Sequence, residues 1–391
     1  MGEATAFTIR AARPDEYAAV AALTDRAFAA GPYGHLPVSA ERRALVDAVA
    51  ERAAAGAVLI ALEHDPDPDL VRDLDLAGAA GRGRADAAAG RLLERLPGRI
   101  LGTVSLLHAG SAQSRLAVGE EAELRLLGVA PEARGRGIGE ALALAAHEEA
   151  LTWGAPAVVL DTGTLNLPAQ RLYERLGYER FTPAGADREP AADADADAAA
   201  SDTRIDHVDY RLPLRDRDDL VIRLVRDDEL DAVAALSLRA YEIAYDLSDG
   251  YRASIAEVAP RARDHQVWVA ADRTTGELLG SVATPRRGGT ISPLAQPGEL
   301  DFRLLAVDPP ARGRGVGEAL TRLVIELARL RGLDRVVMNS GEQMTGAHRL
   351  YGRLGFSRLG EREHDIVDGD RRIRLFAFTI DVPRATGTIA A

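Results

Sequence analysis

The sequence predicts a two-domain α/β protein of the α+β type, in which each domain is a mixed, mostly antiparallel sheet flanked by helices. Three observations support this fold class. The chain has 391 residues, enough for two or three domains of the usual ~100–200 residues. Hydrophobic residues make up 47% of it, which suffices for a packed core. Its second half repeats the first, and segments typical of strands and helices intermix in both halves.

The repeat is visible as blocks of sequence that recur 178 residues apart. RGRGIGEAL begins at Arg134 and RGRGVGEAL at Arg312, while RLYERLGY begins at Arg171 and RLYGRLGF at Arg349. LRLLGV and FRLLAV keep the same spacing, as do GTV and GSV. Near the N-terminus TIRAARPDE matches VIRLVRDDE at a spacing of 213, so the first copy carries about 35 additional residues. We interpret the chain as a tandem duplication.

The repeat also predicts the domain limits, which we place at residues 1–216 and 217–391. Most additional residues of the first copy fall at 65–99, a Pro/Asp-rich and then Ala/Gly/Arg-rich stretch. We interpret it as a long loop with room for a helix near 85–96, and a disordered insertion is the alternative. The acidic run at 183–203 has the composition of a linker, but by analogy with the second copy it is a hairpin loop within domain 1.

Each copy predicts the same elements in the same order. A short strand leads into an amphipathic helix, for which Asp15 and Asp227 are the expected N-caps. A second helical stretch, a hairpin and a strand that ends at a Val precede a glycine-rich turn. A long helix, a buried strand, a helix closed by Gly177 or Gly355, and a last strand follow. In the first copy the expected strands are 7–10, 57–62, 100–107, 157–161 and 205–214, and the long helix is 139–153. In the second copy the expected strands are 220–224, 267–271, 278–284 and 335–339, and the long helix is 317–331.

Composition excludes several classes of function. The 48 basic residues, all of them Arg, and 60 acidic residues leave a net charge of −12, which repels a phosphate backbone. Aromatic residues are only 5% of the chain, so a base-stacking surface is not expected either. The absence of Cys excludes disulfides, a zinc ribbon and a cysteine nucleophile. The eight His residues show no metal-ligand spacing, so no metal is expected.

Targeting signals are also missing from the pattern. The N-terminal segment has no basic stretch followed by an apolar run, as a signal peptide would have. No apolar stretch approaches the roughly 20 residues that span a bilayer. We therefore expect a cytoplasmic protein with neither a membrane nor a nucleic acid as its partner.

The glycine-rich turns lie between a strand and the long helix of each copy. Glycines allow positive φ and close approach of the backbone, and the N–H groups at a helix N-terminus bind anions. Arginines flank the glycines and would supply positive charge. A diphosphate is the expected ligand, and a purely structural turn is the alternative. No Gly-Lys-Ser/Thr follows, so the turn is not a P-loop, and it fits a dinucleotide fingerprint poorly.

The motif Val-x-Pro-x-x-Arg-Gly-x-Gly-x-Gly, followed about 40 residues later by Leu-Tyr-x-x-Leu-Gly-Tyr/Phe, resembles the signature of the GNAT superfamily of N-acetyltransferases. The resemblance covers nearly all of both copies, in the manner of tandem GNAT proteins. It implies that the turn holds the pyrophosphate of acetyl-CoA and that the preceding strand pairs with the pantetheine arm. The implied cofactor residues are Leu127, Val129, Arg134, Gly135, Arg136, Gly137, Ile138, Gly139 and Asn166, and in the second copy Leu305, Val307, Arg312, Gly313, Arg314, Gly315, Val316 and Gly317. Met344 stands where Asn166 repeats, so the second copy departs from the pattern there.

Acetyl transfer to an amine needs a group that removes a proton, because an amine is mostly protonated at pH 7. Glu123 and Asp301 each lie six residues before the Val that ends the strand, and a period of two puts them on its face. The matching position carries the catalytic glutamate in some GNAT enzymes. Glu121 and Glu299 share that face and are rivals, and a merely solvated acidic strand start is the alternative.

The leaving thiolate, with an intrinsic pKa near 8.5, needs a proton donor, and the oxyanion needs a backbone N–H. The resemblance implies that Tyr173 and Tyr351 are the donors, since the Tyr of the Leu-Tyr motif points at the CoA sulfur in many family members. Packing of an amphipathic helix is the alternative role of these tyrosines.

Together these features predict an N-acetyltransferase that moves an acetyl group from acetyl-CoA, as co-substrate, to an amine of a small molecule or peptide. Without Cys, direct attack in a ternary complex is favoured, and the first copy is the better-kept site. The resemblance implies that segments 28–33 and 241–251 shape the acceptor pocket, and the acidic charge favours a cationic amine. The alternatives are one active domain beside a degenerate structural one, and a non-catalytic acyl-CoA-binding regulatory protein. A homodimer is also left open.

Overall fold

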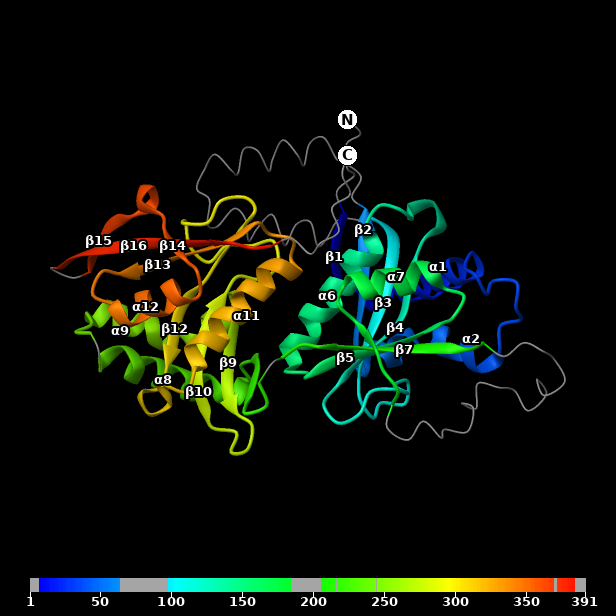
Figure 1. Cartoon of the computed structure of the whole chain (residues 1–391), viewed down its shortest axis with the longest axis horizontal. Coiled ribbons are helices and arrows are strands. Elements are labelled where there is room, and N and C mark those ends of the chain that lie inside the picture. Colours follow the sequence, from blue (N-terminus) through cyan, green and yellow to red (C-terminus); the bar gives the residue numbers. More distant parts are fainter. Residues whose placement is uncertain are drawn as a thin grey trace. The chain divides into compact units, whose positions relative to one another are not determined.

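A computed structural model describes residues 7–63, 98–183, 205–215, 217–243, 245–368 and 371–383. The chain divides into two compact units (Figure 1). Unit 1 here means the described residues up to 215, and unit 2 means those from 217 onward. The predicted insertion at 65–99, its helix near 85–96 and the acidic loop at 183–203 lie outside the described residues, apart from their edges.

Unit 1 is built on one seven-stranded sheet, with strand order β1-β2-β3-β4-β5-β7-β6. The pairings are antiparallel except that between β4 and β5, which is parallel. Apolar runs such as GAVLIALE of β2 are buried on both faces, because helices cover the sheet on each side. The strands are β1 (Phe7–Ala11), β2 (Gly56–Glu63), β3 (Arg99–His108), β4 (Ala122–Val129), β5 (Ala157–Gly163), β6 (Glu179–Arg180) and β7 (His207–Pro213).

The helices of unit 1 are α1 (Tyr17–Ala29), α2 (Ala40–Asp47), α3 (Val49–Ala54), α6 (Ile138–Trp153) and α7 (Leu167–Arg175). A Cβ built on Gly102 of β3 would meet Leu142 and Ile138 of α6. A Cβ on Gly128 of β4 would instead meet Ala27 of α1. Gly128 pairs with Thr103, the neighbour of Gly102, so α1 and α6 cover opposite faces of the sheet.

Unit 2 repeats this architecture with the sheet divided in two. One sheet has the order β12-β10-β9-β8, and the other has β11-β13-β16-β14 with β15 paired to β16. The break falls between β11 and β12, which together correspond to β4 of unit 1. The strands are β8 (Leu220–Leu224), β9 (Gln266–Asp272), β10 (Leu278–Thr284), β11 (Glu299–Asp301), β12 (Arg303–Val307), β13 (Arg335–Gly341), β14 (Ser357–Arg358), β15 (His364–Asp368) and β16 (Arg371–Asp381).

The helices of unit 2 are α8 (Leu230–Glu242), α9 (Asp249–Ala256), α10 (Val258–Asp264), α11 (Val316–Leu330) and α12 (Thr345–Arg353). Apolar residues at helical spacing bury one face of α11 against the strands, and these include Leu320, Val324 and Leu327. Ser237 of α8 meets Ser281 of β10 at 3.3 Å, so α8 covers the same side of β10 as α1 covers of β3.

The predicted fold class is confirmed in both units, which are mixed, mostly antiparallel sheets flanked by helices. The predicted C-cap glycines are confirmed as well, since Gly177 and Gly355 follow α7 and α12 with φ values of 90° and 91°. The N-cap prediction was wrong, because Asp15 and Asp227 lie inside short 3-10 turns. Each capping carboxylate belongs instead to the Glu at the end of the turn, as for Glu16, which accepts the Arg13 N–H at 2.8 Å.

Candidate functional site

A glycine turn joins β4 to α6 in unit 1 and β12 to α11 in unit 2. Two glycines of each turn have φ between 77° and 81°, namely Gly135, Gly137, Gly313 and Gly315. Gly137 and Gly315 are the N-caps of the long helices, so no N-cap side chain accepts from the first N–H groups. The structure thus brings the predicted segments 134–139 and 312–317 to helix N-termini, where backbone N–H groups can bind an anion.

The third glycine of each turn is a packing position. A Cβ on Gly139 would lie 3.6 Å from Cγ2 of Val129 and 3.7 Å from Cδ2 of Leu172. The equivalent distances at Gly317 are both 3.3 Å. These glycines therefore let the start of the long helix lie close to the end of the strand and to the helix that carries the RLY motif.

The first arginine of each motif is hydrogen-bonded to backbone carbonyls at the end of a helix. Arg134 donates to the carbonyls of Ala27 at 2.7 Å and Ala30 at 3.0 Å, at the end of α1. Arg312 donates to the carbonyl of Ala240 near the end of α8 at 2.8 Å. The last carbonyls of a helix lack intrahelical partners, and these guanidinium groups satisfy them.

The second arginine is paired with a carboxylate in both units. Arg136 lies 2.8 Å from Glu63, and Arg314 lies 2.7 Å from Asp272. The hydrogen bond from Arg314 lowers the pKa of Asp272 to about 2. These arginines are thus engaged by carboxylates, and their role in binding an anion stays a prediction. Anion binding would rest mainly on the backbone N–H groups, because partners distant in sequence engage the guanidinium groups.

The strand before the turn separates from its neighbour. Strand β4 pairs with β5 only at Ala122 and Glu123 in the described residues, and its later residues, such as Gly128 and Val129, pair with β3 alone. In unit 2, β11 pairs with β13 while β12 pairs with β10. Among the described residues, each unit therefore has a strand edge without a partner strand beside its glycine turn, at the predicted residues Leu127, Val129, Leu305 and Val307. In unit 2 the hydroxyl of Tyr241 donates to the Leu305 carbonyl at this edge, at 3.4 Å.

A β-bulge, which sequence analysis missed, lies at the point of separation. Leu126 and Leu304 have φ of 52° and 54°, the left-handed region that costs a leucine about 1–2 kcal/mol. At the first of them two residues of β4 oppose Val104 of β3. Strain at equivalent positions of both units is typical of a functional site. Leucine itself gives no sequence signal for this conformation.

Glu123 is fully buried and holds a loop. Its Oε2 accepts the backbone N–H groups of residues 115–117 at 2.6–3.2 Å and the hydroxyl of Ser114 at 2.8 Å. Its Oε1 lies 3.6 Å from Nε of Arg125 and has no hydrogen-bond partner among the described residues. One carboxylate oxygen is therefore fully engaged, and a role as base stays a prediction that rests on Oε1.

Asp301 occupies the equivalent place in unit 2 with fewer bonds. It is 1% exposed, its Oδ1 accepts the N–H of Ile291 at 3.0 Å, and its Oδ2 accepts the hydroxyl of Ser292 at 2.6 Å. Burial raises the pKa of Asp301 above its ordinary value. A raised pKa moves a carboxylate toward the range in which general bases work.

The rival carboxylates are occupied by arginines. Glu121 lies 2.9 Å from Nε of Arg211, and Glu299 lies 2.5 Å from Nη1 of Arg362. These ion pairs sit beside the separated strands. They leave Glu123 and Asp301 as the stronger candidates for the base.

The predicted proton donors are buried in aromatic clusters. The ring centroid of Tyr173 lies 5.6 Å from that of Tyr178, and the centroid of Tyr351 lies 6.3 Å from that of Phe302. Burial raises the pKa of both tyrosines, so each hydroxyl stays protonated at neutral pH. Each can donate a hydrogen bond, and their catalytic role stays a prediction.

The helix that carries each of these tyrosines begins at Asn166 in unit 1 and at Met344 in unit 2. Asn166 is the N-cap of α7, and its Nδ2 donates to Oγ1 of Thr162 at 3.3 Å. Met344 is the N-cap of α12 and packs against an apolar cluster that includes Tyr241 and Leu247. The two units therefore differ in polarity at this position.

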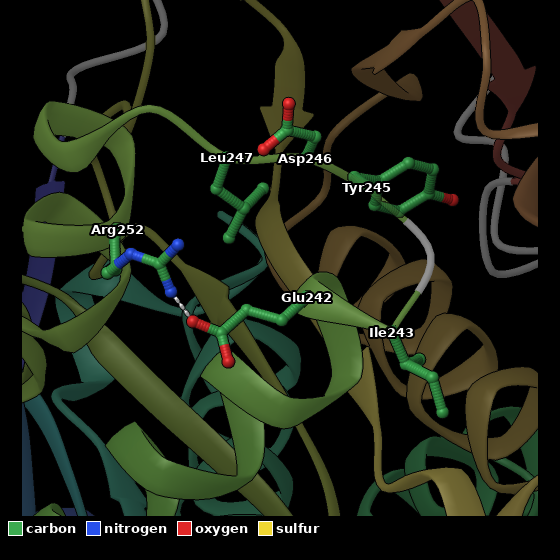
Figure 2. Close-up of a pocket in the computed structure, with 6 residues that line it drawn as sticks. All are labelled: Glu242, Ile243, Tyr245, Asp246, Leu247 and Arg252. Carbon is green, nitrogen blue, oxygen red and sulfur yellow. Dashed lines mark ion pairs between the residues drawn. The ribbon is translucent and has the colours of Figure 1, made fainter.

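An open pocket of about 560 Å³ lies at the loop between α8 and α9 (Figure 2). It coincides with the segment expected to shape an acceptor site, 241–251. Glu242 and Arg252 form an ion pair, and Tyr245 points away from it. The lining residues are Glu242, Ile243, Tyr245, Asp246, Leu247 and Arg252.

In unit 1 the corresponding segment packs onto the end of β5. The hydroxyl of Tyr33 accepts the N–H of Leu165 at 2.7 Å, and its ring lies directly against Gly163. Tyr33 therefore covers the loop before Asn166, whereas the pocket of unit 2 is open.

The part of the chain that the structure describes holds no group of three or more His, Cys, Asp or Glu side chains arranged to bind a metal ion. Its helices are all too short or too polar to cross a membrane.

A family model described as "Acetyltransferase (GNAT) family" matches the chain twice, at residues 43–178 and 230–356. Each match contains one glycine turn, one candidate carboxylate and one candidate tyrosine. The two matches together cover more than half of the chain.

Individual relatives and solved structures are also similar. Mycothiol acetyltransferase of Cellulomonas flavigena is 40% identical over 106 residues, which are 25% of this chain and 30% of that protein. Glucosamine 6-phosphate N-acetyltransferase 1 of Oryza sativa subsp. japonica is 35% identical over 108 residues, 28% of this chain and 62% of that protein. The chain thus matches less than two thirds of either relative. A Salmonella typhimurium protein solved with its cofactor acetyl-CoA is 19% identical, with a TM-score of 0.33 over 44% of this chain and 98% of that one.

Proposed function

Because the chain belongs to the GNAT acetyltransferase family, we propose that it transfers an acetyl group from acetyl-CoA to a small-molecule or peptide amine. The observation that carries this proposal is the combination, found in both units, of a strand edge left unpaired by its neighbour and an uncapped helix N-terminus at a glycine turn. We propose that the domains follow the predicted limits, 1–216 and 217–391, and that the enzyme works in the cytoplasm.

The donor would lie along that edge. The N–H groups of the turn would bind the pyrophosphate, and the backbone of Leu127–Val129 or Leu305–Val307 would pair with the amide-bearing arm. The loss of strand pairing after Glu123 and after Asp301 supports this placement, because it leaves backbone donors and acceptors to be satisfied by a ligand. The two glycines of left-handed conformation in each turn support it too.

In unit 2 we propose the following steps of acetyl transfer. Asp301 accepts a proton from the ammonium form of the acceptor, and the free amine attacks the thioester carbonyl. A backbone N–H of the bulge at Leu304 stabilises the oxyanion. As the C–S bond breaks, the hydroxyl of Tyr351 donates its proton to the leaving sulfur, and the proton that the attacking nitrogen loses restores the tyrosine hydroxyl. The products are an N-acetyl amide and free CoA thiol, and the proton held by Asp301 returns to solvent.

Two observations support unit 2 as a transferring unit. Its candidate base has a raised pKa, and its α8–α9 loop forms an open pocket. The sequence alone favours unit 1 on the strength of Asn166. A protein with one transferring unit and one structural unit therefore stays an alternative to two active sites.

The first test is the stoichiometry of acetyl-CoA binding measured by titration calorimetry. We expect two equivalents, and we expect Gly135→Val and Gly313→Val each to weaken one site by roughly tenfold or more. Nothing lies within 4 Å of a Cβ at either glycine, so the side chain would enter the space of the ligand instead of disturbing the core. The loss of one charge-assisted N–H bond, about 1.5–3 kcal/mol, accounts for that magnitude.

Matched controls separate ligand loss from backbone strain. Gly110 and Gly276 also have positive φ, of 77° and 74°, and open surroundings, but they lie in other loops. Gly110→Val and Gly276→Val should leave both sites intact. Acetyl transfer is measured by detecting the released CoA thiol with a thiol reagent. Because the chain has no Cys, the protein itself adds no background to this signal. If the chain binds no acetyl-CoA, the acetyltransferase proposal is wrong.

A further inference from the structure

Arg303 of β12 has neither a hydrogen-bond partner nor an ion-pair partner among the described residues, and its side chain is exposed. It lies two residues after Asp301, across the break between β11 and β12. The equivalent residues of unit 1, Glu123 and Arg125, lie on one face of the continuous strand β4. Arg303 is also next to the strained Leu304, at the point where β12 separates from β13.

A second arginine reinforces the positive charge on this face. Arg261 of α10 donates to the carbonyl of Ile255 at 3.4 Å and to that of Ser254. Burial and then the nearby charge of Arg303 lower the pKa of Arg261, while Glu257 opposes that effect. The two positive charges repel one another, and an anion bound at Arg303 would reduce this repulsion.

In unit 1 the arginine at the equivalent position has a carboxylate close to it. This arginine, Arg125, donates to the carbonyl of Gln113 at 2.5 Å and lies 3.6 Å from Glu123, with a side chain 16% exposed. Asp301 is one methylene shorter than Glu123, and its oxygens are held by Ser292 and Ile291. The shorter carboxylate therefore does not reach the arginine, and Arg303 is left to a ligand.

The electrostatic field of Arg303 reaches an aromatic cluster of unit 2. Tyr241 and Tyr251 pack edge to face with ring centroids 6.2 Å apart, and Arg303 acts electrostatically on Tyr241. The corresponding pair in unit 1 is Phe28 with Arg42, whose guanidinium lies 4.5 Å from the ring centroid. At these positions unit 2 therefore has two tyrosines, whereas unit 1 has a phenylalanine and an arginine.

We propose that the acceptor of unit 2 is an amine that also carries a carboxylate or a phosphate, and that Arg303 binds this anionic group. This proposal rests on the proposed function and specifies its substrate class. It replaces the expectation of a purely cationic amine, which followed from the net charge of the whole chain. Recognition of a small ligand depends on the charges close to it, and Arg303 is a positive charge close to the candidate base. An anion held at Arg303 would keep the amine near Asp301.

The test compares matched acceptor pairs with the full chain and acetyl-CoA. Glucosamine 6-phosphate is measured against glucosamine, and glycine against glycinamide, so that phosphate and carboxylate are distinguished. We expect the anionic member of at least one pair to have the higher kcat/KM. Arg303→Gln should lower that value about 10- to 100-fold while leaving the neutral member nearly unchanged, as expected for loss of a hydrogen bond to a charged group. Arg303→Lys should restore part of the preference, because it keeps the charge but not the two parallel donors.

The control variant is Arg322→Gln on the surface of α11, where the arginine pairs only with Glu318 one turn away. It should leave both members of each pair unchanged. Calorimetry of the same compounds with the CoA-loaded chain measures the preference without turnover. Equal binding of charged and neutral members, or a preference that survives Arg303→Gln, would overturn this proposal. Binding that depends on Arg303 without any transfer would instead count against the proposed function.

Discussion

Replacing Asp301 by Asn is expected to lower acetyl transfer by unit 2 by about 10²- to 10⁴-fold, the usual contribution of a positioned general base. Asparagine has the same shape and can keep both bonds, accepting from the Ile291 N–H and meeting the hydroxyl of Ser292. It cannot accept a proton from the amine. Acetyl-CoA binding should stay unchanged, which calorimetry of the variant checks.

The pH dependence gives a second readout of the same residue. Burial raises the pKa of Asp301, and the group works as a base only when ionised. The transfer rate should therefore rise with pH through a pKa above that of an ordinary aspartate, and this limb should disappear in Asp301→Asn. The contribution of Asp301 to the stability of the folded protein depends on pH in the opposite direction. A carboxyl that holds its proton more tightly in the folded state stabilises the protein at low pH, and this contribution is lost as pH rises through its pKa.

The stability of Asp301→Asn distinguishes a loss of catalysis from a loss of folded protein. At neutral pH the variant should be as stable as the parent or slightly more so, because Asn removes the cost of a buried charge. A variant that unfolds earlier in denaturant would mean that Asp301 has a structural role. An unchanged rate would contradict its role as base.

Removing Glu123 is expected to have its largest effect on the stability of unit 1. Glu123→Ala leaves the N–H groups of residues 115–117 without their acceptor and Arg125 without its nearest carboxylate. Breaking a buried ionic interaction of this kind costs about 3–5 kcal/mol. Hydrogen exchange should show loss of protection at residues 115–117 first, and then across β4.

Two further variants separate this role from catalysis. Glu120→Ala changes an exposed carboxylate of the same loop, whose ion pair with Arg215 is 3.8 Å long, and should cost less than about 0.5 kcal/mol. Glu123→Gln keeps the size of the side chain. If it is stable and yet transfer by unit 1 is lost, Glu123 is the base predicted from the sequence, and its role as a loop anchor is secondary.

The positions of most elements could be predicted from local patterns in the sequence. Most strand and helix positions followed from hydrophobic patterns and from the repeat, so that β10 has the predicted bounds and α6 begins one residue early. The N-caps were missed because Asp15 and Asp227 are suitable capping residues by type. The backbone instead forms a 3-10 turn that places Glu16 and Glu229 at the cap.

The sequence by itself determined the tandem organisation, the fold class and the positions of both glycine turns, because each depends on residues close together in the chain. Tertiary structure alone decided which charges are free. Arg134 and Arg136 are neighbours of the turn in sequence, but their donors are taken by α1 and by Glu63. Arg125 and Arg303 are equivalent in the repeat, yet only the first has a carboxylate within reach. Electrostatic interactions fall off with distance in space and not along the chain, so a guanidinium becomes a binding group only where the fold leaves it unpaired.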